Sequence, residues 1–361
     1  MQEQGEGGRA FQFHGNWREF APIAFTNLLL TIVTLGVYMF WARTRERRYL
    51  WSQTRFIDDR LEWTGTGLEL FIGYLLALLV FVLPLGLVQF GVQALAIRGQ
   101  DGAAALLLVG VYVAVMYLVG VAVFRALRYR LSRTFWHGIR GGSDRQGFGY
   151  GLSHLWKTFA GSLALGLLVP WAMVSLWNER WNAMSFGPHQ FESNGESGGL
   201  MARYLLYYLV PIIFFVGIVI VAALFGPVTR APISSPEDIQ IGFVLIAVIL
   251  YFGFFIVLGL IALIYYAAYF REVVSNLSLG DLDFEFRART KDWLKLFIGN
   301  FFLVVLTLGI GTIFLGYRNW AFFIRHMHAY GSLNLDDFTQ SNTRQPGQGE
   351  GLLDAFDVGA F

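Results

Sequence analysis

The sequence contains no cysteine and little charge. Without cysteine the chain has no disulfide, no thiol nucleophile and no cysteine-ligated metal site. Only 14% of its 361 residues are charged, against roughly 25% in an ordinary soluble domain. The net charge of +2 argues against a nucleic-acid-binding protein. What remains is strongly apolar, with 55% hydrophobic residues and a mean hydropathy of +0.51, which is typical of a chain that lies mostly in lipid.

Residue patterns that would support catalysis or cofactor binding are also scarce. The six histidines include no HExxH motif and no three-histidine set. Neither a GxSxG motif nor a P-loop is present. Asp281 and Asp283 resemble an acidic catalytic pair, but they fit better at the polar start of an alternating strand. We therefore expect no enzymatic activity, no metal site and no cofactor.

Four stretches carry no charged residue, and each exceeds the ~20 residues that cross a bilayer as a helix. These stretches are 70–97, 103–124, 204–228 and 241–270. They form two pairs, each joined by a short polar turn. The pattern predicts two transmembrane helical hairpins, at 70–124 and 204–270.

Three shorter apolar segments, 20–42, 158–176 and 296–317, are copies of one another. A shift of 130 residues superposes identical residues of the first two copies: Leu35-Gly36 on Leu165-Gly166, Trp41-Ala42 on Trp171-Ala172, and Trp51 on Trp181. A shift of 273 does the same for the first and third: Phe11 on Phe284, Asn27 on Asn300, and Thr34-Leu35-Gly36 on Thr307-Leu308-Gly309. The repeats extend over about 11–65, 135–195 and 284–335, and they alternate with the two hairpins. We therefore predict one membrane domain, 1–335, followed by a disordered tail at 336–361.

Each repeated segment either spans the membrane or enters it and returns to the same side. If all seven segments span, 17 of the 27 lysines and arginines lie on one side and 10 on the other. If the three repeated segments are re-entrant, the split becomes 25 to 2, which fits the positive-inside rule far better. A glycine near the middle of each segment, at Gly36, Gly166 and Gly309, suits a structural turn. The re-entrant architecture is therefore favoured, although 19 to 23 apolar residues are also long enough to span.

Short stretches with period-two alternation lie between the membrane segments, for example at 11–13, 61–63 and 282–286. Such alternation is typical of β-strands. The predicted fold class is thus an all-α polytopic membrane protein with small β elements on its cytoplasmic face.

Two blocks of the sequence resemble a known family. The first block contains Phe11-Gln12-Phe13-His14-Gly15, Thr34-Leu35-Gly36 and Trp41-Ala42-Arg43, and the second contains Thr134-Phe135-Trp136-His137-Gly138 and Pro170-Trp171. Together they resemble the YjgN family of bacterial inner-membrane proteins over nearly the whole chain. The third repeat keeps Thr307-Leu308-Gly309 but lacks the Pro-Trp element. The resemblance implies a multi-pass protein of the bacterial inner membrane, and it implies no reaction because the family is one of unknown function.

One set of polar residues recurs at the same depth of the repeated segments. Asn27 and Asn300 occupy matching positions, and Lys157 lies at the equivalent place in the second repeat. Unpaired polar groups are costly in hydrocarbon, so we predict that the three side chains converge as a polar cluster near the bundle axis. The alternative is local: each side chain caps its own helix or reaches toward the cytoplasmic surface.

Two further groups are candidate sites in the spans and at their ends. Gln89 and Gln93 lie one turn apart in the first predicted hairpin and suit an interhelical hydrogen-bonded pair. Basic residues follow two apolar segments and are candidate contacts for anionic lipid: Arg43, Arg45, Arg47, Arg48, Arg125 and Arg128. Positive-inside anchoring explains the same residues without a specific lipid site.

Two functions fit these features. The first is passage or transport of an unidentified solute or lipid, with the repeats meeting around a central cavity. The second is a non-catalytic scaffold or accessory subunit that docks a protein partner, which the resemblance suggests could be a membrane metallopeptidase. Membrane lipids are expected partners in both, and nucleic acid in neither. A polar, water-accessible cavity among the repeated segments would favour transport, and its absence would favour the scaffold.

Overall fold

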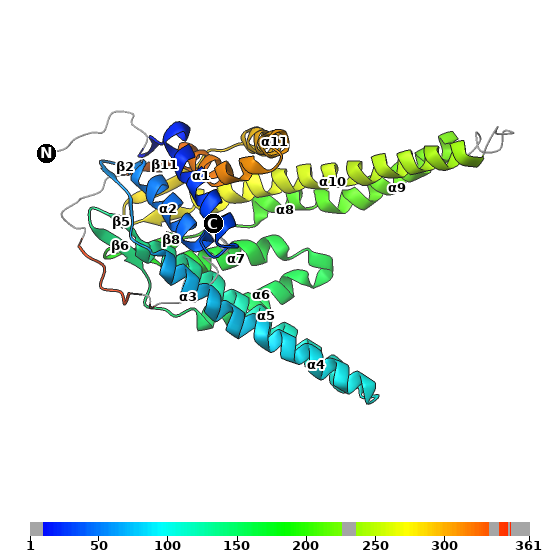
Figure 1. Cartoon of the computed structure of the whole chain (residues 1–361), viewed down its shortest axis with the longest axis horizontal. Coiled ribbons are helices and arrows are strands. Elements are labelled where there is room, and N and C mark those ends of the chain that lie inside the picture. The colour runs from blue at the N-terminus through cyan, green and yellow to red at the C-terminus, as the bar shows by residue number, and fades with distance from the viewer. Residues whose placement is uncertain (1–9, 226–235, 332–338, 346, 348–361) are drawn as a thin grey trace.

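A computed structural model of the chain describes residues 10–225, 236–331, 339–345 and 347. The protein is mostly helical, and its strands gather at one end, from which the helices extend (Figure 1). Four helical stretches are long and apolar enough to cross a membrane: Gly67–Ile97, Asp101–Arg133, Gly198–Ile220 and Val248–Ser275. They correspond to the four uncharged runs of the sequence.

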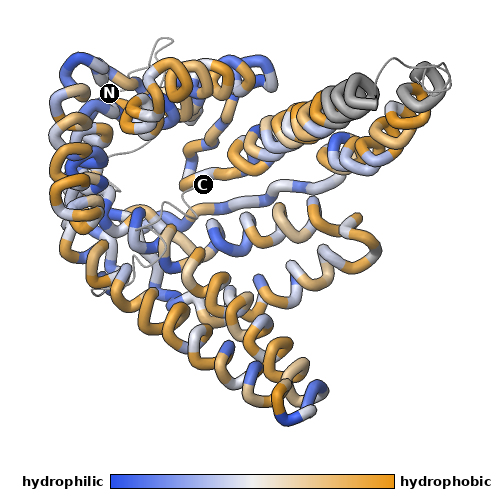
Figure 2. The backbone as a smooth tube through the Cα atoms, turned by 45° about the vertical axis from the view of Figure 1, so that its right-hand side comes forward, coloured by the Kyte–Doolittle hydropathy of each residue, from blue (hydrophilic) through white to orange (hydrophobic). Residues whose placement is uncertain are grey.

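The two long helical hairpins form arms that diverge from a common base (Figures 1 and 2). The first arm consists of α3 (Gly67–Ala77), the π-helical turn η1 (Leu78–Val82), α4 (Leu83–Ile97) and the returning helix α5 (Asp101–Arg133). The second consists of α8 (Gly198–Tyr204), α9 (Leu206–Phe225) and α10 (Pro236–Ser275). The predicted turn of the second arm lies largely outside the described residues. Each arm is held by packing along its length, α4 on α5 and α9 on α10.

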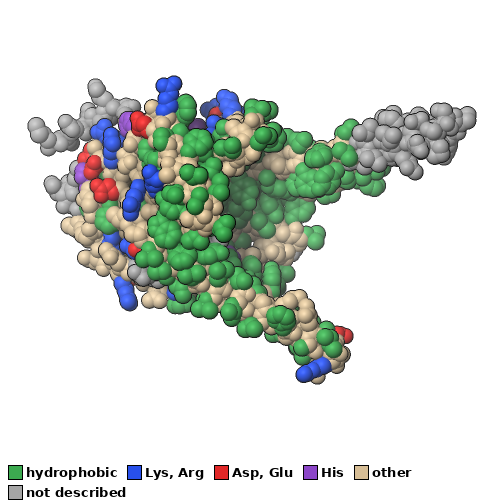
Figure 3. All heavy atoms as spheres, in the orientation of Figure 1, with side chains coloured by type: hydrophobic (Ala, Val, Ile, Leu, Met, Phe, Trp, Pro, Cys, Tyr) green, Lys and Arg blue, Asp and Glu red, His purple; other side chains and the backbone are tan. Residues whose placement is uncertain are grey.

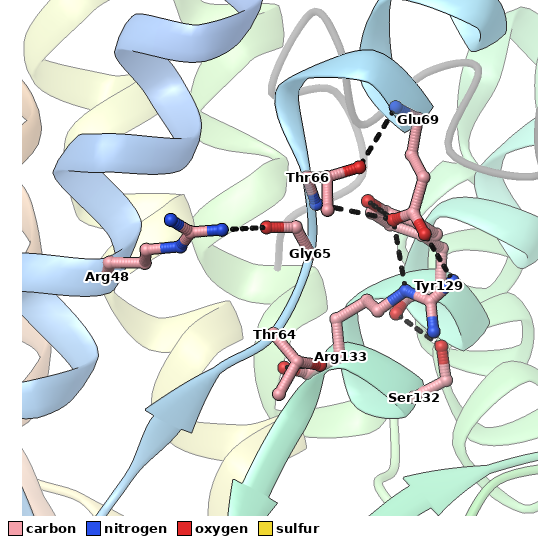
Figure 4. A network of polar contacts seen from close by, with 8 residues as sticks. All are labelled: Arg48, Thr64, Gly65, Thr66, Glu69, Tyr129, Ser132 and Arg133. Carbon is pink, nitrogen blue, oxygen red and sulfur yellow. Dashed lines mark hydrogen bonds and ion pairs between the residues drawn. The ribbon is translucent and has the colours of Figure 1, made fainter.

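A polar network fixes the base of the first arm (Figure 4). Glu69 closes a capping box with Thr66 at the start of α3. Its carboxylate also accepts hydrogen bonds from the Tyr129 hydroxyl at 2.8 Å and from Arg133 at 2.7 and 3.1 Å. Because Tyr129 and Arg133 lie at the end of α5, this one carboxylate ties the two ends of the arm together.

Each of the three repeats contains two helices joined by a sharp turn. The pairs are α1 (Trp17–Val33) with α2 (Met39–Ser52), α6 (Phe148–Ser162) with α7 (Val169–Trp181), and α11 (Thr290–Leu306) with α12 (Leu315–His326). Short 3-10 turns, η2 (Ala164–Gly166) and η4 (Ile310–Phe314), lie inside the second and third pairs. We call these units the short hairpins. None of the three repeated segments is one continuous helix.

The chain reverses at the Leu-Gly pair that the repeats share. The leucine and the glycine of each pair both have positive φ, for example 50° and 92° at Leu35 and Gly36, and 51° and 93° at Leu308 and Gly309. Left-handed geometry is easy for glycine and unfavourable for leucine. Each leucine is also almost fully exposed, with 94% exposure for Leu35 and 93% for Leu308. An apolar side chain thus projects from the tip of every short hairpin.

Threonine hydroxyls help to end the first helix at these turns. In the first repeat Thr34 Oγ1 donates to Leu30 O and accepts from Tyr38 N. In the third, Thr307 Oγ1 donates to Leu303 O and accepts from Gly311 N. The hydroxyl therefore satisfies backbone groups that the interrupted helix leaves unpaired.

The β structure is larger than the sequence predicts, and the small cytoplasmic elements must be corrected to two antiparallel sheets. One has three strands, β1 (Phe11–Phe13), β2 (Thr54–Phe56) and β3 (Asp59–Arg60). The other is an eight-stranded half-barrel in the order β11-β10-β9-β8-β7-β6-β5-β4. Its strands are β4 (Glu62–Trp63), β5 (Thr134–Trp136), β6 (Ile139–Gly142), β7 (Ser185–Phe186), β8 (His189–Ser193), β9 (Leu277–Leu279), β10 (Leu282–Phe286) and β11 (Met327–Tyr330).

The strand order follows the path of the chain. The strands before and after each short hairpin pair with one another, as β1 with β2, β6 with β7 and β10 with β11. The strands before and after each long arm also pair, as β4 with β5 and β8 with β9. Each short hairpin and each long arm therefore begins and ends at neighbouring strands, which places the three repeats around one centre.

The long arms separate the repeats at only two of three junctions. The first arm lies between repeats one and two, and the second between repeats two and three. At the third junction, which we call the closing seam, α1 packs directly on the short hairpin of repeat three. Phe20 stacks on Tyr317 with ring centroids 5.2 Å apart, and the Tyr317 hydroxyl donates to Gly15 O at 2.8 Å.

Part of the predicted disordered tail is built into the fold. The Gln340 side chain donates to Gly138 O, the Ser341 hydroxyl bonds to Thr343 Oγ1, and the Arg140 guanidinium donates to Thr343 O. The prediction of disorder is therefore wrong for 339–345, and the rest of 336–361 lies outside the described residues except Gly347. Burial, followed by the charges of Arg133 and Arg128, lowers the pKa of Arg140.

The turn geometry predicts that substitutions at two glycines change the stability of the protein in opposite directions. A Cβ at Gly309 or at Gly86 would meet nothing within 4 Å, so only the backbone distinguishes the two sites. At Gly309, where φ is 93°, Gly309→Ala should destabilise the protein by about 1–2 kcal/mol. In the helical interior of α4, Gly86→Ala should stabilise it by about 0.5–1 kcal/mol. The free energy of unfolding in mixed detergent micelles measures both, and stabilisation by both substitutions would indicate a continuous helix at Gly309.

Candidate functional site

A cavity of about 260 Å³ lies at the centre of the three repeats, between the strands and the last turns of the short hairpins. Its lining is aromatic and aliphatic except for Arg130 and Thr134. The apolar lining residues are Phe11, Trp51, Phe56, Leu61, Leu127, Leu131, Trp136, Trp177, Trp181, Phe186, Phe191, Val274, Leu277, Leu279, Phe284, Trp320, Phe323, Ile324 and Met327. We call it the central cavity.

Matching positions of the repeats build this cavity. The shifts of 130 and 273 relate Trp51 to Trp181 and Ile324, and all three lie in the last turns of α2, α7 and α12. The same shifts relate Trp177 to Trp320, which line it one turn earlier. Because the flanking strands hold the hairpin ends around one centre, equivalent side chains point to the same space.

Two of the five tryptophans that line the cavity have indole N–H groups without an acceptor in the described part of the chain. Trp51 Nε1 donates to Thr134 Oγ1, Trp320 Nε1 donates to Thr54 Oγ1, and Trp136 Nε1 donates to Phe56 O, at 2.9 to 3.0 Å. The buried Nε1 atoms of Trp177 and Trp181 find no partner among the described residues. A buried donor left unpaired costs about 1–3 kcal/mol, and because both nitrogens are enclosed by protein atoms, they are not offered to an occupant of the cavity.

The size of the cavity favours an occupant. An apolar cavity of about 150 Å³ is large enough to hold benzene, and this one is larger. A molecule with an apolar body of this size would fill the space and bury its apolar surface against the lining.

The three matched polar residues have partners within their own hairpins. Asn27 Nδ2 donates to Ala42 O and, at 3.4 Å, to Glu46 Oε1. Lys157 Nζ forms an ion pair of 2.7 Å with Glu179.

In the third repeat Asn300 bonds to the side chains of Asn319 and Arg318. In all three repeats the polar residue on the first helix therefore joins a polar side chain on the second. These bonds stay within each hairpin: they show neither the helix capping of the local alternative nor a contact among the three residues, so the shared cluster stays a prediction.

The predicted glutamine pair lies at the surface of α4. Gln89 and Gln93 are both exposed on α4, and neither makes a hydrogen bond in the described part of the chain. Both amides therefore lie on the exposed side of α4, and an interhelical bond to a helix outside the described chain stays a prediction.

The candidate lipid-binding arginines divide into buried and exposed groups. Arg47 is buried and lies over the Trp63 ring at 5.0 Å. Arg128 is buried as well and donates to Arg344 O. Burial makes these two structural, and it argues against the predicted lipid contact for them.

The remaining four are more accessible. Arg48 is exposed and donates to Gly65 O, and Arg125, partly exposed, donates to Gln146 O. Arg45 is exposed, whereas Arg43 is partly buried, with one guanidinium nitrogen enclosed. Of the six candidates, Arg45 and Arg48 are the ones whose exposure suits contact with lipid headgroups.

Sequence reasoning did not identify the cavity tryptophans as a site. Trp51 and Trp181 were visible as repeat positions. The additional signal that could have found the site is the recurrence of bulky apolar residues just before the strand that follows each short hairpin.

The ion pair of the second repeat generates a stability prediction. The Lys157 side chain is 11% exposed and that of Glu179 is 30% exposed. Lys157→Met should therefore destabilise the protein by about 1–3 kcal/mol, because a partly buried carboxylate is left without its cation. Adding Glu179→Leu should restore most of the loss, since replacing both partners removes the unpaired charge.

A comparable pair at the surface provides the control. Arg287 and Glu285 lie 2.8 Å apart with side chains 52% and 38% exposed. Arg287→Met should cost less than about 1 kcal/mol. Thermal unfolding in detergent measures all three variants. An equal loss in Lys157→Met and in the double variant would contradict a paired role for Lys157 and Glu179.

Comparisons with known proteins identify the family. No solved structure matches the chain. The "Inner membrane protein YjgN" of Salmonella typhimurium (strain LT2) is 28% identical over 130 residues, which cover 36% of this chain and 30% of the relative. The protein of the same name from Escherichia coli (strain K12) is 36% identical over 66 residues, 18% of this chain and 17% of the relative. The matched stretches thus span less than a third of these relatives. A family model described as "Bacterial protein of unknown function (DUF898)" matches residues 9–355, so the resemblance to the YjgN proteins is confirmed and the chain belongs to this family.

Proposed function

We propose that the protein is an inner-membrane carrier of a lipid-soluble, amphiphilic molecule, whose apolar part occupies the central cavity. The observation that carries this proposal is the lining of that cavity, which is apolar apart from Arg130 and Thr134. The apolar walls suit a hydrocarbon chain, each buried methylene of which contributes about 0.8 kcal/mol. Arg130 and Thr134 supply the polar part of the lining for its polar end.

The same lining argues against passage of an ion. Pathways for ions need polar groups, because a desolvated charge must be compensated along its route. The exposed and apolar middles of the four candidate spans carry no charged side chain in the described residues, and the cavity adds only Arg130. A lipid-soluble passenger needs no such compensation.

The distribution of charge supports an arrangement in which only the two long arms cross the bilayer. Charged side chains gather around the end of the molecule that carries the strands, whereas on the described part of the arms hydrophobic side chains predominate, with charged ones at the tip of the first arm (Figure 3). Exposed leucines lie at the tips of the short hairpins, where hydrocarbon would solvate them and water would not. The short hairpins are then re-entrant, and the strand-bearing end is the cytoplasmic face. The names of the two relatives agree with an inner-membrane location.

A scaffold is the second candidate, and one observation favours it. Gln89 and Gln93 present two unpaired amides on the exposed side of a candidate span. A partner helix carrying a polar residue would satisfy them, at a gain of about 1 kcal/mol for each interhelical hydrogen bond. This role is compatible with a membrane-embedded partner, such as the metallopeptidase suggested by the resemblance.

The natural absence of cysteine makes the membrane arrangement testable with single cysteines. Gln100→Cys lies at the turn of the first arm, and Asn194→Cys lies at an exposed site beside β8. We expect an impermeant maleimide to label Gln100→Cys in intact cells, and to label Asn194→Cys only after the membrane is opened. Seven spans would place both sites on the same side, so labelling of both in intact cells would exclude the re-entrant arrangement.

A substitution that narrows the central cavity tests whether an amphiphilic molecule binds in it. Leu279 lines the cavity and Leu200 does not, and both are buried in the same core. Leu279→Phe should lower the affinity for a brominated fatty acid at least about tenfold, because the added ring fills the space of the ligand. Leu200→Phe should leave it unchanged while causing a similar overpacking cost of about 1–3 kcal/mol.

Saturable quenching of tryptophan fluorescence by the brominated fatty acid reports this binding, since five tryptophans line the cavity. If Leu279→Phe fails to fold, Val274→Leu serves instead: it narrows the same cavity by a smaller step and should weaken binding several-fold. Equal quenching in all variants would overturn the carrier proposal. Purification with one protein partner at constant ratio and without an amphiphile would favour the scaffold.

A further inference from the structure

A second and very different pocket lies where α10 ends and α11 begins. It has a volume of about 720 Å³ and is lined by four cations, Arg271, Arg287, Arg289 and Lys291, against one carboxylate, Glu285. The lining therefore carries three net positive charges, four minus one. These cations come from the end of α10, from the loop after β10 and from the first turn of α11. Anchoring by the positive-inside rule requires only that such residues share a side of the membrane, not that they converge on one hollow.

Contacts within the chain leave much of this charge uncompensated. Arg287 Nε donates to Glu285 Oε2 at 2.8 Å, so the single carboxylate is already paired. Burial raises the pKa of Glu285, but hydrogen bonds from Arg287 and Tyr330 outweigh it and hold the pKa below its usual value. Arg271 Nη1 donates to Ala288 O.

Two cations of the pocket have no such partner. Among the described residues, the Arg289 guanidinium and the Lys291 ammonium make no hydrogen bond or ion pair. The nearest acid in sequence, Asp292, accepts the backbone N–H of Arg289. These two exposed cations line the pocket and are therefore available to bind an anion.

At the second repeat, oxygen acceptors from the tail of the chain occupy the place that is equivalent to this pocket. A shift of 143 places β9 and β10 on β5 and β6 and relates Arg271 to Arg128. Arg128 donates to the carbonyl oxygen of Arg344, and the neighbouring Arg140 donates to the carbonyl of Thr343. The tail of the chain thus supplies oxygen acceptors to the arginines of the second repeat. In the third repeat no described residue of the tail does so.

The position of the pocket matches the level of lipid phosphates. Arg271 directly follows the apolar run of α10, which ends at Phe270. Basic pockets beside transmembrane helices on this side bind anionic headgroups, with about 1 kcal/mol for each cation near the surface. Arginine also matches the geometry of phosphate oxygens through its planar fork of donors.

We propose that this pocket binds a phosphate group, held by Arg271, Arg289 and Lys291 and bordered by the Thr290 hydroxyl. The phosphate belongs either to an anionic lipid headgroup or to a soluble phosphate compound. The site is separate from the central cavity, so the proposal stands whether or not that cavity carries an amphiphile.

The test removes the two unpaired cations together. Arg289→Gln with Lys291→Gln changes two exposed side chains, so the fold should persist, and a thermal melt checks this. The matched control is Arg55→Gln with Arg60→Gln, two exposed arginines of β2 and β3 that lie outside the pocket. Both double variants remove two charges. If the pocket double variant fails to fold, Lys291→Gln alone replaces it.

Two probes distinguish the source of the phosphate. Native mass spectrometry of the full-length protein counts retained phosphatidylglycerol against phosphatidylcholine, and titration calorimetry measures inorganic phosphate. We expect the pocket variant to lose affinity about tenfold for whichever probe binds, and the control to lose less than about twofold. Phosphatidylglycerol binding alone assigns the site to a lipid headgroup, and phosphate binding alone assigns it to a soluble compound. Equal losses in both double variants, or no binding of either probe, would overturn the proposal.

Discussion

The reversal of the chain at three Leu-Gly pairs is the constraint on which the rest of the architecture depends. A continuous helix would carry the strands that flank each repeated segment to opposite ends of the molecule. Because each segment turns back after about four helical turns, the flanking strands return to the same level and pair, as β1 does with β2. The long arms obey the same rule at their bases, where Glu69 joins both ends of the first arm. One backbone conformation, repeated three times, thus permits both the half-barrel and the cavity beneath it.

Part of this architecture follows directly from the sequence, because it rests on local patterns. Uncharged runs of more than 20 residues predict the four apolar helices. The glycine at the middle of each repeat coincides with the break in the helix. The strand at 282–286 shows its alternation, with Leu282, Phe284 and Phe286 buried. Each of these features needs only its own neighbours in the chain to form.

The candidate sites were predicted less well, because they depend on partners that are distant in sequence. Nothing local to Arg128 indicates that it is buried against a tail more than 200 residues away. The partner of Lys157 is Glu179, which becomes close only when the hairpin folds. The strands were each too short to reveal that eight of them share one sheet, since pairing is decided across the arms and hairpins. The central cavity has the same origin, since its walls come from all three repeats.

The closing seam sets the order in which the protein is completed. Tyr317 bonds to Gly15 and Trp320 bonds to Thr54, so the last repeat supplies contacts that the first repeat lacks on its own. The aromatic face formed by Phe20, Tyr49 and Trp51 is covered by this late-arriving partner. During synthesis, about 265 further residues must therefore be made before the last repeat can cover this face. A chain that ends before α12 would leave this aromatic face exposed. Quality-control proteases degrade incompletely folded chains, so such a truncated protein should be short-lived.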